Sequence, residues 1–517
     1  MALDQGTTNS RAIVFDHAGQ VLGMAQEKIS SYYPQPGWVE QNPEEIWETQ
    51  LHCAQQALAR AGLQASDLAA LGVTNQRETA LLWDAATGRA LGNAIVWQCR
   101  RTAARCEELR QAGFEPLIET RTGLRLDPYF SATKFEWLLT HHEETDRLLA
   151  EGRLRLGTVD SFLAWRLTAG RLHVTDHTNA SRTMLLDLHT LTWDEELLRL
   201  FQVPRAALPK LVSSCGVLGE TEPSLLGAPV PIAALIGDQQ AALLGQGAFH
   251  VGDCKNTYGT GCFLLMNVGT TPLAPAHGLL STVAWTTVPS IKLLATPSYA
   301  LEGSVFMAGG ALQWVAEILG LEGGPAQVGP MAAKAPDNGG TYFVPAFIGL
   351  GTPYWDPHAR GLLIGLTRAT RQEHLARAAE EAICLQTRAV MEAMEATSGL
   401  KINRLLADGG AASDDFLLQL QADLLGVPVS RRDLRESTAL GAAALAGLAV
   451  GFWKESEIPA LAGGEQTFTP NLHKHIRNDL YHEWLRAAER AAGWAKPAAE
   501  VQAGDSAQAD AHHCQQS

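Results

Sequence analysis

The sequence predicts an α/β protein built from two similar halves. Strand-like runs alternate with helical runs along the chain, which is typical of the α/β class. A turn rich in Gly and Thr follows a strand at 4–8, and a second such turn occurs at 258–261. The chain has 517 residues, and this length suggests roughly two to four domains. A chain of this size buries a large core without needing disulfides or metals.

The first half begins with three predicted strands, which start at Ala2, Ala12 and Val21 and suggest an antiparallel meander. A helix should follow at about 43–61, because Asn42 can cap it, Pro43 suits its first turn and a glycine ends it. A short strand is expected at 69–73. Only three residues precede Asp4, so we expect the first strand to lack ladder hydrogen bonds and apolar burial. We therefore expect either that the true start of the protein lies upstream or that this form of it is destabilised. A chain extended by the missing strand should then have a higher melting temperature.

The second half is predicted to repeat this plan. A buried strand at 230–236 leads into a helix at Asp238, a turn at 256–261 precedes a strand at 262–266, and a strand at 405–407 precedes a glycine-rich turn. We place the junction near 246–253, which divides the chain into domains at 1–247 and 248–496. Residues 497–517 have almost no large apolar side chain, so this tail should be disordered.

Composition excludes several classes of protein. The chain carries 40 basic and 55 acidic residues, a net charge of −15, and it has no Lys/Arg-rich run for nucleic acid. The uncharged stretch 437–453 is rich in Ala and Gly and shorter than the roughly 20 apolar residues of a membrane span, so we expect a core helix there. Eight cysteines without a CxxC pair suggest reduced, mostly buried thiols and a cytoplasmic location. P-loop and dinucleotide-binding motifs are missing.

Three glycine-containing turns are candidates for phosphate or nucleotide binding. In the turn at 4–8, backbone N–H groups and two threonine hydroxyls can bind an anion, Arg11 can add a positive charge, and Asp4 can hold Mg²⁺. An ordinary hairpin turn is the alternative reading. The turn at 258–261 is a second candidate, and the turn at 409–413, which precedes a helix, is a third.

Two positions at the ends of predicted strands carry charge. Asp238 stands where a buried strand meets a helix, so it is either a helix N-cap or a general base in a ligand cleft. Arg77 and Glu78 follow another strand. They are either part of a solvated turn or a clamp for a polyol.

Taken together, the motifs resemble those of the FGGY family of carbohydrate kinases, and within it the branch that phosphorylates glycerol. The resemblance covers nearly all of the chain except its tail. It rests on the runs at 4–8, 36–41, 74–79, 93–98, 127–131, 174–176, 179–184, 237–241, 258–263, 299–303 and 349–356. The runs at 77–78 and 127–131, together with Trp97, are similar to the glycerol branch rather than to sugar kinases in general.

The resemblance implies two ribonuclease H-like domains of the actin and sugar-kinase superfamily with a cleft between them. It also implies transfer of a phosphoryl group from ATP to glycerol, giving sn-glycerol 3-phosphate for glycerol catabolism, with Mg²⁺ as cofactor and Asp238 as general base. A homo-oligomer, either a dimer or a tetramer, is expected. The implied glycerol ligands are Arg77, Glu78, Trp97, Tyr129, Asp238, Gln239 and Phe263. The implied nucleotide ligands are Thr7, Thr8, Asn9, Arg11, Gly259, Thr260, Gly309, Gln313, Gly410 and Asp414, and the metal ligands are Asp4 and Asp238.

The sequence departs from the family pattern at two places, and it leaves two alternative functions open. Asp414 stands where the family usually has Asn, which removes amide donors from the adenine-side loop. The glycine-containing run at 226–230 lacks the Arg through which some bacterial members bind fructose 1,6-bisphosphate, and the segment 204–238 lacks the His that is phosphorylated in others. The alternatives are a related kinase for another polyol or a ketopentose, and a non-catalytic, actin-like ATP-binding protein.

Overall fold

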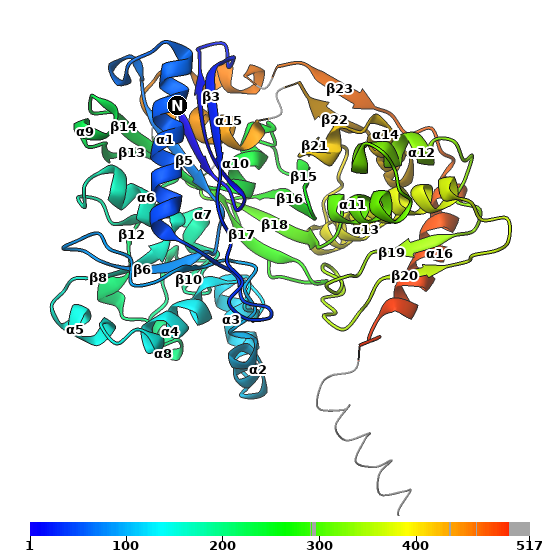
Figure 1. The fold of residues 1–517 in the computed structure, drawn as a ribbon, viewed down its shortest axis with the longest axis horizontal. Helices are drawn as coiled ribbons and strands as arrows, with labels where there is room; N and C mark the ends of the chain where they lie inside the picture. Colours follow the sequence, from blue (N-terminus) through cyan, green and yellow to red (C-terminus); the bar gives the residue numbers. More distant parts are fainter. Residues whose placement is uncertain (290, 292–295, 434–435, 462, 496–517) are drawn as a thin grey trace, which may run out of the picture.

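The computed structural model describes residues 1–289, 291, 296–433, 436–461 and 463–495. The chain forms two lobes, each organised around a twisted β-sheet (Figure 1). The first lobe lies on the left of the view and the second on the right. The predicted tail at 497–517 lies outside the described residues.

The sheet of the first lobe has the strand order β13-β14-β5-β1-β2-β3. Strand β1 pairs antiparallel with β2 and parallel with β5, and all four of its residues pair on both sides. The predicted meander β1-β2-β3 is thus confirmed, and β1 does not lack ladder partners within its described length. The strands are β1 (Ala2–Gln5), β2 (Asn9–Phe15), β3 (Val21–Lys28), β5 (Leu71–Asn75), β13 (Cys215–Glu220) and β14 (Pro231–Gly237).

The sheet of the second lobe repeats this arrangement in the order β17-β18-β16-β15-β21-β22-β23. The hairpin β15–β16 corresponds to β1–β2, because β15 also pairs parallel with β21 as β1 does with β5. In each sheet a further parallel strand and then an antiparallel strand follow, so the predicted repetition of halves is confirmed. The strands are β15 (Cys254–Tyr258), β16 (Cys262–Gly269), β17 (Leu280–Trp285), β18 (Ser298–Val305), β21 (Leu405–Asp408), β22 (Val429–Arg432) and β23 (Glu465–Phe468).

Smaller sheets extend both lobes. A four-stranded sheet in the first lobe has the order β4-β7-β6-β8, and three two-stranded pairs are β10–β11, β9–β12 and β19–β20. Their bounds are β4 (Glu40–Gln41), β6 (Ala80–Asp84), β7 (Ala94–Ile95), β8 (Leu154–Thr158), β9 (Val174–Asp176), β10 (Leu186–Asp187), β11 (Thr192–Trp193), β12 (Lys210–Val212), β19 (Tyr342–Val344) and β20 (Leu362–Ile364).

Helices cover the sheets of both lobes (Figure 1). In the first half of the chain they are α1 (Pro43–Ala61), α2 (Ala103–Gln111), α3 (Glu115–Thr122), α4 (Ser131–His141), α5 (Thr145–Ala150), α6 (Val159–Leu167), α7 (His177–Ala180), α8 (Glu195–Leu200), α9 (Pro223–Leu226) and α10 (Asp238–Gly245). In the second half they are α11 (Gly309–Ile318), α12 (Val328–Ala332), α13 (Gln372–Ser398), α14 (Asp415–Leu425), α15 (Ser437–Ala449) and α16 (Lys474–Ala491).

Helix α1 forms where its local signals predict it. The Asn42 side chain accepts a hydrogen bond from the Glu44 backbone N–H, which satisfies one of the free donors at the helix start. Gly62 ends the helix in the left-handed conformation, at φ 68°. The helix packs along β2 and β3.

Helix α15 is the core helix that the sequence predicts, and it packs against α10 and the first-lobe strands β14 and β5. Its small residues are required, because a Cβ at Gly441 would stand 1.9 Å from the Ala241 carbonyl oxygen. Among the described residues, no helix is long and apolar enough to cross a membrane. The seven described cysteines are buried and free of disulfides, whereas Cys514 lies outside the described part of the chain.

Candidate active site

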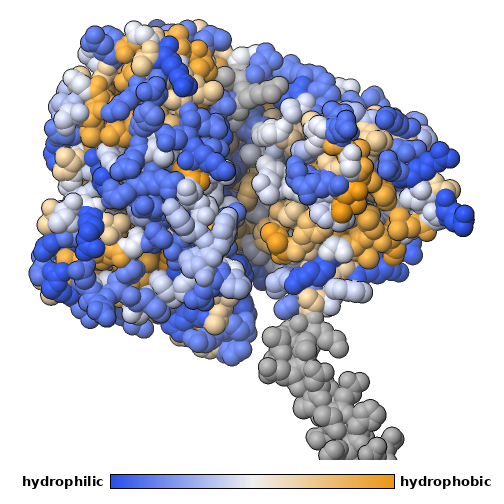
Figure 2. All heavy atoms as spheres, in the orientation of Figure 1, coloured by the Kyte–Doolittle hydropathy of each residue, from blue (hydrophilic) through white to orange (hydrophobic). Residues whose placement is uncertain are grey.

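The predicted glycerol ligands converge where the two lobes meet. Strands β1, β5 and β14 end there in the first lobe, and residues of β15, β16 and β18 approach from the second. Figure 2 shows the surface hollowed along the line between the lobes. The carboxyl ends of parallel strands are the usual place for a ligand in an open α/β sheet.

Arg77 and Glu78 lie just after β5, separated from it by Gln76, and are buried, being 3% and 1% exposed. The solvated-turn reading of this pair is therefore wrong. The Arg77 guanidinium donates from Nη1 to Glu302 Oε2 at 2.6 Å and from Nη2 to Glu302 Oε1 at 3.1 Å. Glu78 has a φ of 61°, a conformation that non-glycine residues adopt rarely and mostly where surrounding contacts enforce it.

The N-cap reading of Asp238 is also wrong. Gly237 occupies the N-cap position of α10, and Asp238 is the first helical residue. Its Oδ1 lies 3.3 Å from Arg77 Nε and accepts a hydrogen bond from the Gln239 backbone N–H at 2.7 Å. Burial raises the pKa of the Asp238 carboxyl, and Arg77 opposes that rise. The side chain is still 27% exposed, so a ligand can reach it.

Gln239 is held by a lysine of the second lobe. Lys255 on β15 donates from Nζ to Gln239 Oε1 at 2.5 Å and to Thr257 Oγ1 at 2.8 Å. Lys255 is fully buried, and this burial lowers the pKa of its ammonium group. The contact fixes the amide of Gln239 beside the carboxylate of Asp238.

Three aromatic side chains form one wall of the site. The ring of Trp97 meets Tyr129 edge-on at 5.5 Å and Phe263 of the second lobe at 6.2 Å. Trp97 Nε1 donates to Thr7 Oγ1 at 2.9 Å, so the wall is joined to the turn at 4–8. The structure therefore brings the proposed carbon-binding residues next to the proposed phosphate turn.

The turn at 4–8 closes as a hairpin, with the Gly6 N–H donating to the Asn9 carbonyl at 3.0 Å. Thr8 is exposed, whereas Asp4 is buried. Burial raises the pKa of Asp4 to about 7, and the charges of Asp238 and Glu436 contribute to the rise. Arg11 Nη1 pairs with Glu436 Oε2 at 2.9 Å and lies 3.9 Å from Asp4 Oδ2, so Arg11 already has a partner in this structure.

The donor set fits a magnesium ion. Asp4 and Asp238 influence each other electrostatically inside a buried region with an excess of negative charge, which a divalent cation would balance. Within the described residues, no group of three or more His, Cys, Asp or Glu side chains is placed to hold a metal. Mg²⁺ is commonly bound by one or two carboxylates, with waters and substrate phosphates completing its shell.

Three nucleotide candidates of the second lobe lie together. The Gly259 carbonyl accepts a hydrogen bond from the Gly309 N–H at 3.0 Å, and the Thr260 carbonyl accepts one from the Gly310 N–H at 3.1 Å. A Cβ at Gly309 would stand 2.6 Å from the Gly259 carbonyl oxygen, so only glycine permits this approach. The start of α11 is thereby fixed against the turn at 258–261.

The other three candidates differ in their surroundings. Gly410 faces open space, since a Cβ there would meet nothing within 4 Å. Gln313 donates to Glu317 at 2.6 Å on the surface of α11. Asp414 caps α14 by accepting from the Phe416 backbone N–H at 2.8 Å, so its carboxylate serves the helix in this structure.

Several charged residues of this region were not among the predicted site residues, although the motif runs at 179–184 and 299–303 contain two of them. They are Arg182, Lys255, Glu302 and Glu436, and the first three are fully buried. The available signal was a lone charge inside an otherwise uncharged run, as at Glu302 within 296–305. Their partners are distant in sequence, so spacing alone gave no indication of the ion pairs.

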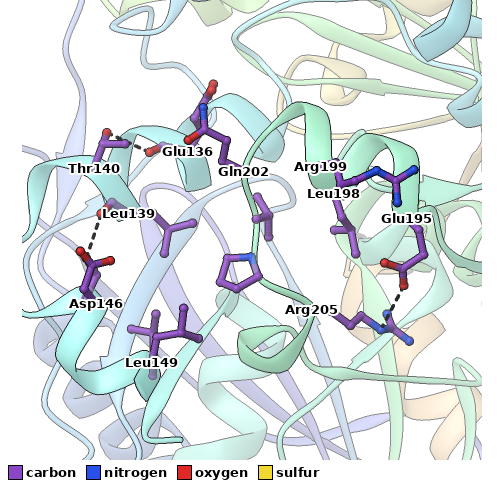
Figure 3. Close-up of a pocket in the computed structure, with 14 residues that line it drawn as sticks. Glu136, Leu139, Thr140, Asp146, Leu149, Glu195, Leu198, Arg199, Gln202 and Arg205 are labelled. Atoms are coloured by element: carbon purple, nitrogen blue, oxygen red, sulfur yellow. Dashed lines mark hydrogen bonds and ion pairs between the residues drawn. The ribbon is translucent and has the colours of Figure 1, made fainter. Parts of the chain in front are cut away.

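A separate pocket of about 440 Å³ lies in the first lobe, away from these residues (Figure 3). It is lined by residues of α4, α5 and α8 and of the short 3₁₀ helix Arg205–Ala207, including Glu136 and Arg199. None of the predicted site residues lines it.

Comparisons with known proteins show the family of the chain. Profiles of the FGGY family of carbohydrate kinases match residues 1–245 (N-terminal domain) and 254–450 (C-terminal domain). The glycerol kinase of Symbiobacterium thermophilum is 51% identical over 96% of this chain and 98% of its own, and the glycerol kinase 2 of Thermotoga maritima is 50% identical over 96% and 99%.

Solved structures show the same fold. The Plasmodium falciparum glycerol kinase with ADP is 31% identical, with a TM-score of 0.87 over 95% of this chain and 97% of its own. The xylulose kinase of Lactobacillus acidophilus has a TM-score of 0.84 over 95% of this chain and 98% of its own, at 23% identity. The two-domain kinase fold expected from the sequence is confirmed, and the chain belongs to the FGGY family of carbohydrate kinases.

Proposed function

We propose that this protein is a glycerol kinase, which transfers the γ-phosphoryl group of ATP to a terminal hydroxyl of glycerol and forms sn-glycerol 3-phosphate. The observation that carries the proposal is the buried Arg77–Glu78 pair beside Asp238, in a chain about half identical to named glycerol kinases over nearly its full length. Such a product places the enzyme in the breakdown of glycerol.

Asp238 acts as the general base. It takes the proton from the attacking hydroxyl, because its carboxylate is accessible to a ligand and its pKa is raised toward the working pH. The Arg77 guanidinium beside it keeps the ionised form of the carboxylate available. The Gln239 amide, fixed by Lys255, orients a neighbouring hydroxyl.

Arg77 and Glu78 select the triol. A guanidinium donates to hydroxyl oxygens and a carboxylate accepts from hydroxyl hydrogens, so the pair matches two hydroxyls of one substrate. Trp97, Tyr129 and Phe263 supply the apolar surface against which the carbon chain packs. A site with buried polar groups rejects an analogue that lacks a matching hydroxyl, because those groups would be left unpaired.

The nucleotide lies between the turn at 4–8, with Thr7, Thr8, Asn9 and Arg11, and the second-lobe surface formed by Gly259, Thr260, Gly309, Gln313, Gly410 and Asp414. Asp4 and Asp238 would hold Mg²⁺, which when bound neutralises phosphate charge. Positioning and charge neutralisation supply most of the catalysis in phosphoryl transfer. Closure of the lobes excludes water, which is the competing acceptor.

A coupled assay that follows ADP release with glycerol, ATP and Mg²⁺ tests the function directly. We expect turnover with glycerol and little or none with D-xylulose or D-ribulose. A preference for a ketopentose would replace this function by that of a related family member. ATP binding without any transferred phosphate would favour a non-catalytic ATP-binding protein.

We further infer a cytoplasmic homo-oligomer. Seven buried, unbridged thiols suit a reducing compartment, which is also where ATP is available. Cell fractionation tests the location, and size-exclusion chromatography with light scattering distinguishes a dimer or tetramer from a monomer.

A further inference from the structure

A closed network of four buried charges joins the two lobes behind the proposed glycerol site. Arg77, Glu78 and Arg182 come from the first lobe, and Glu302 comes from β18 of the second. Each is at most 3% exposed. Two positive and two negative charges alternate in this network, so it is neutral as a unit.

Glu302 is the member that accepts hydrogen bonds from both arginines. Its Oε1 accepts from Arg77 Nη2 at 3.1 Å and from Arg182 Nη2 at 3.0 Å, and its Oε2 accepts from Arg77 Nη1 at 2.6 Å. Burial alone would raise the pKa of this carboxyl, but Arg182 and Arg77 outweigh burial and lower the pKa to about 2. Glu302 is therefore a permanently charged acceptor with a fixed geometry.

Arg182 links Glu302 to Glu78 by hydrogen bonds to both carboxylates. Its Nε donates to Glu78 Oε1 at 2.6 Å while its Nη2 is held by Glu302. The guanidinium is planar, so two contacts fix its orientation and with it the position of the Glu78 carboxylate. Both charged residues of the proposed glycerol clamp are thus oriented by the Glu302 carboxylate, Arg77 directly and Glu78 through Arg182.

We propose that Glu302 is a positioning residue through which the second lobe sets the geometry of the glycerol clamp in the first. The inference rests on the proposed glycerol kinase function. Arg77 has three acidic neighbours: Glu302 engages both Nη atoms, Asp238 lies 3.3 Å from Nε, and Glu78 lies 3.9 Å from Nε. With Glu302 neutralised, the anions that remain beside Arg77 in the described part of the chain are Asp238 and Glu78, and the guanidinium turns toward them and away from the substrate.

The test is glycerol binding measured by calorimetry on the full chain, without ATP, in wild type and Glu302→Gln. Gln keeps the shape of the side chain and removes its charge. We expect glycerol affinity to fall at least about tenfold, because charge-assisted bidentate hydrogen bonds are roughly twice as strong as neutral ones. ATP affinity should stay within about twofold, because the network contacts no proposed nucleotide residue. Discrimination between glycerol and 1,2-propanediol should also shrink.

A matched control and a second variant separate positioning from stability. Glu381 on α13 is another buried carboxylate with an arginine partner, Arg377 Nε at 2.9 Å, and Glu381→Gln should leave glycerol affinity unchanged. Arg182→Lys keeps the positive charge, but a single ammonium cannot reproduce the planar two-carboxylate contact. We expect it to weaken glycerol binding and to leave ATP binding alone, which keeps the proposal testable if Glu302→Gln fails to fold.

The outcomes are distinct. Wild-type protein that does not bind glycerol would overturn the proposed function itself. Wild-type protein that binds glycerol, with Glu302→Gln or Arg182→Lys binding it equally well, would overturn the positioning role. Parallel losses of glycerol and ATP affinity in a folded variant would also contradict it, since they indicate a general structural effect.

Discussion

Arg77 Nε and Asp238 Oδ1 lie 3.3 Å apart, so the cation of the proposed clamp directly contacts the proposed base. The two residues follow neighbouring parallel strands, β5 and β14. In the proposed mechanism this one charged contact couples substrate binding to proton transfer.

Replacement of Asp238 by Asn should lower kcat by about 10² to 10⁴-fold, the range expected when a general base is lost. ATP should still bind, which calorimetry or a fluorescent nucleotide would show. Turnover at the wild-type rate would remove Asp238 from the role of base.

Replacement of Arg77 by Ala should raise KM for glycerol far more than KM for ATP, because Arg77 belongs to the proposed glycerol clamp and not to the proposed nucleotide site. The same substitution at Arg89, an exposed residue, is the control and should change neither constant. Equal increases in both KM values for Arg77→Ala would contradict the clamp.

Replacement of Asp4 by Asn should raise the Mg²⁺ concentration needed for half-maximal rate by about tenfold or more, as expected when a metal ligand is weakened. Asp16→Asn, in the surface turn after β2, should leave the Mg²⁺ requirement unchanged. Chelation should abolish activity in all three proteins, and added Mg²⁺ should restore it. An unchanged requirement in Asp4→Asn would exclude Asp4 as a ligand.

Asp160 should make the fold less stable at alkaline than at acidic pH. Burial raises the pKa of Asp160 to about 7, and the neighbouring Asp176 adds to the rise. The folded state therefore holds a proton that the unfolded chain releases, and stability falls as the pH rises from about 4 to about 7.

Between pH 5 and 8 this loss is on the order of 2 kcal/mol. Asp160→Asn should remove most of it, as measured by urea unfolding at both pH values. Asp479→Asn, on the exposed surface of α16, should leave this pH-dependent loss of stability unchanged. A loss of the same size in Asp160→Asn and wild type would show that Asp160 is ionised in the fold.

Gly441→Ala should destabilise the protein by about 3 kcal/mol, because the added Cβ would collide with the backbone of α10. Thr438→Ala, in the same helix at a half-buried position, should change the free energy of unfolding by less than about 1 kcal/mol. Equal melting temperatures for the two variants would mean that α10 and α15 can move apart to make room for the added Cβ without a loss in the free energy of unfolding.

Local signals predicted local structure well. Asn42 and Gly62 marked the ends of α1 because capping involves only neighbouring backbone groups. The strand after it was placed less well: β5 begins at Leu71 and includes Thr74 and Asn75, which are polar yet fully buried. The polar side chains of Thr74 and Asn75 suggested that the strand ends before them. The strand continues through both residues because they lie between β1 and β14.

Electrostatic partners could not be predicted in the same way. The Arg11–Glu436 and Arg77–Glu302 pairs join residues 425 and 225 positions apart. Asp238 likewise needed the structure to exclude the helix cap, since a cap and a base both place an acid at a strand-to-helix junction. The residues were identified by type, but their contacts depend on the packing of the two lobes.

Helix α15 has a consequence for the order of events during synthesis. It belongs to the last quarter of the chain, yet it covers strands β5 and β14 of the first-lobe sheet. While the ribosome is still translating the second half, that sheet face has no cover and its apolar side chains stay accessible to chaperones. The first half made alone should therefore aggregate, and native packing of this sheet face is complete only after Ala449 has emerged.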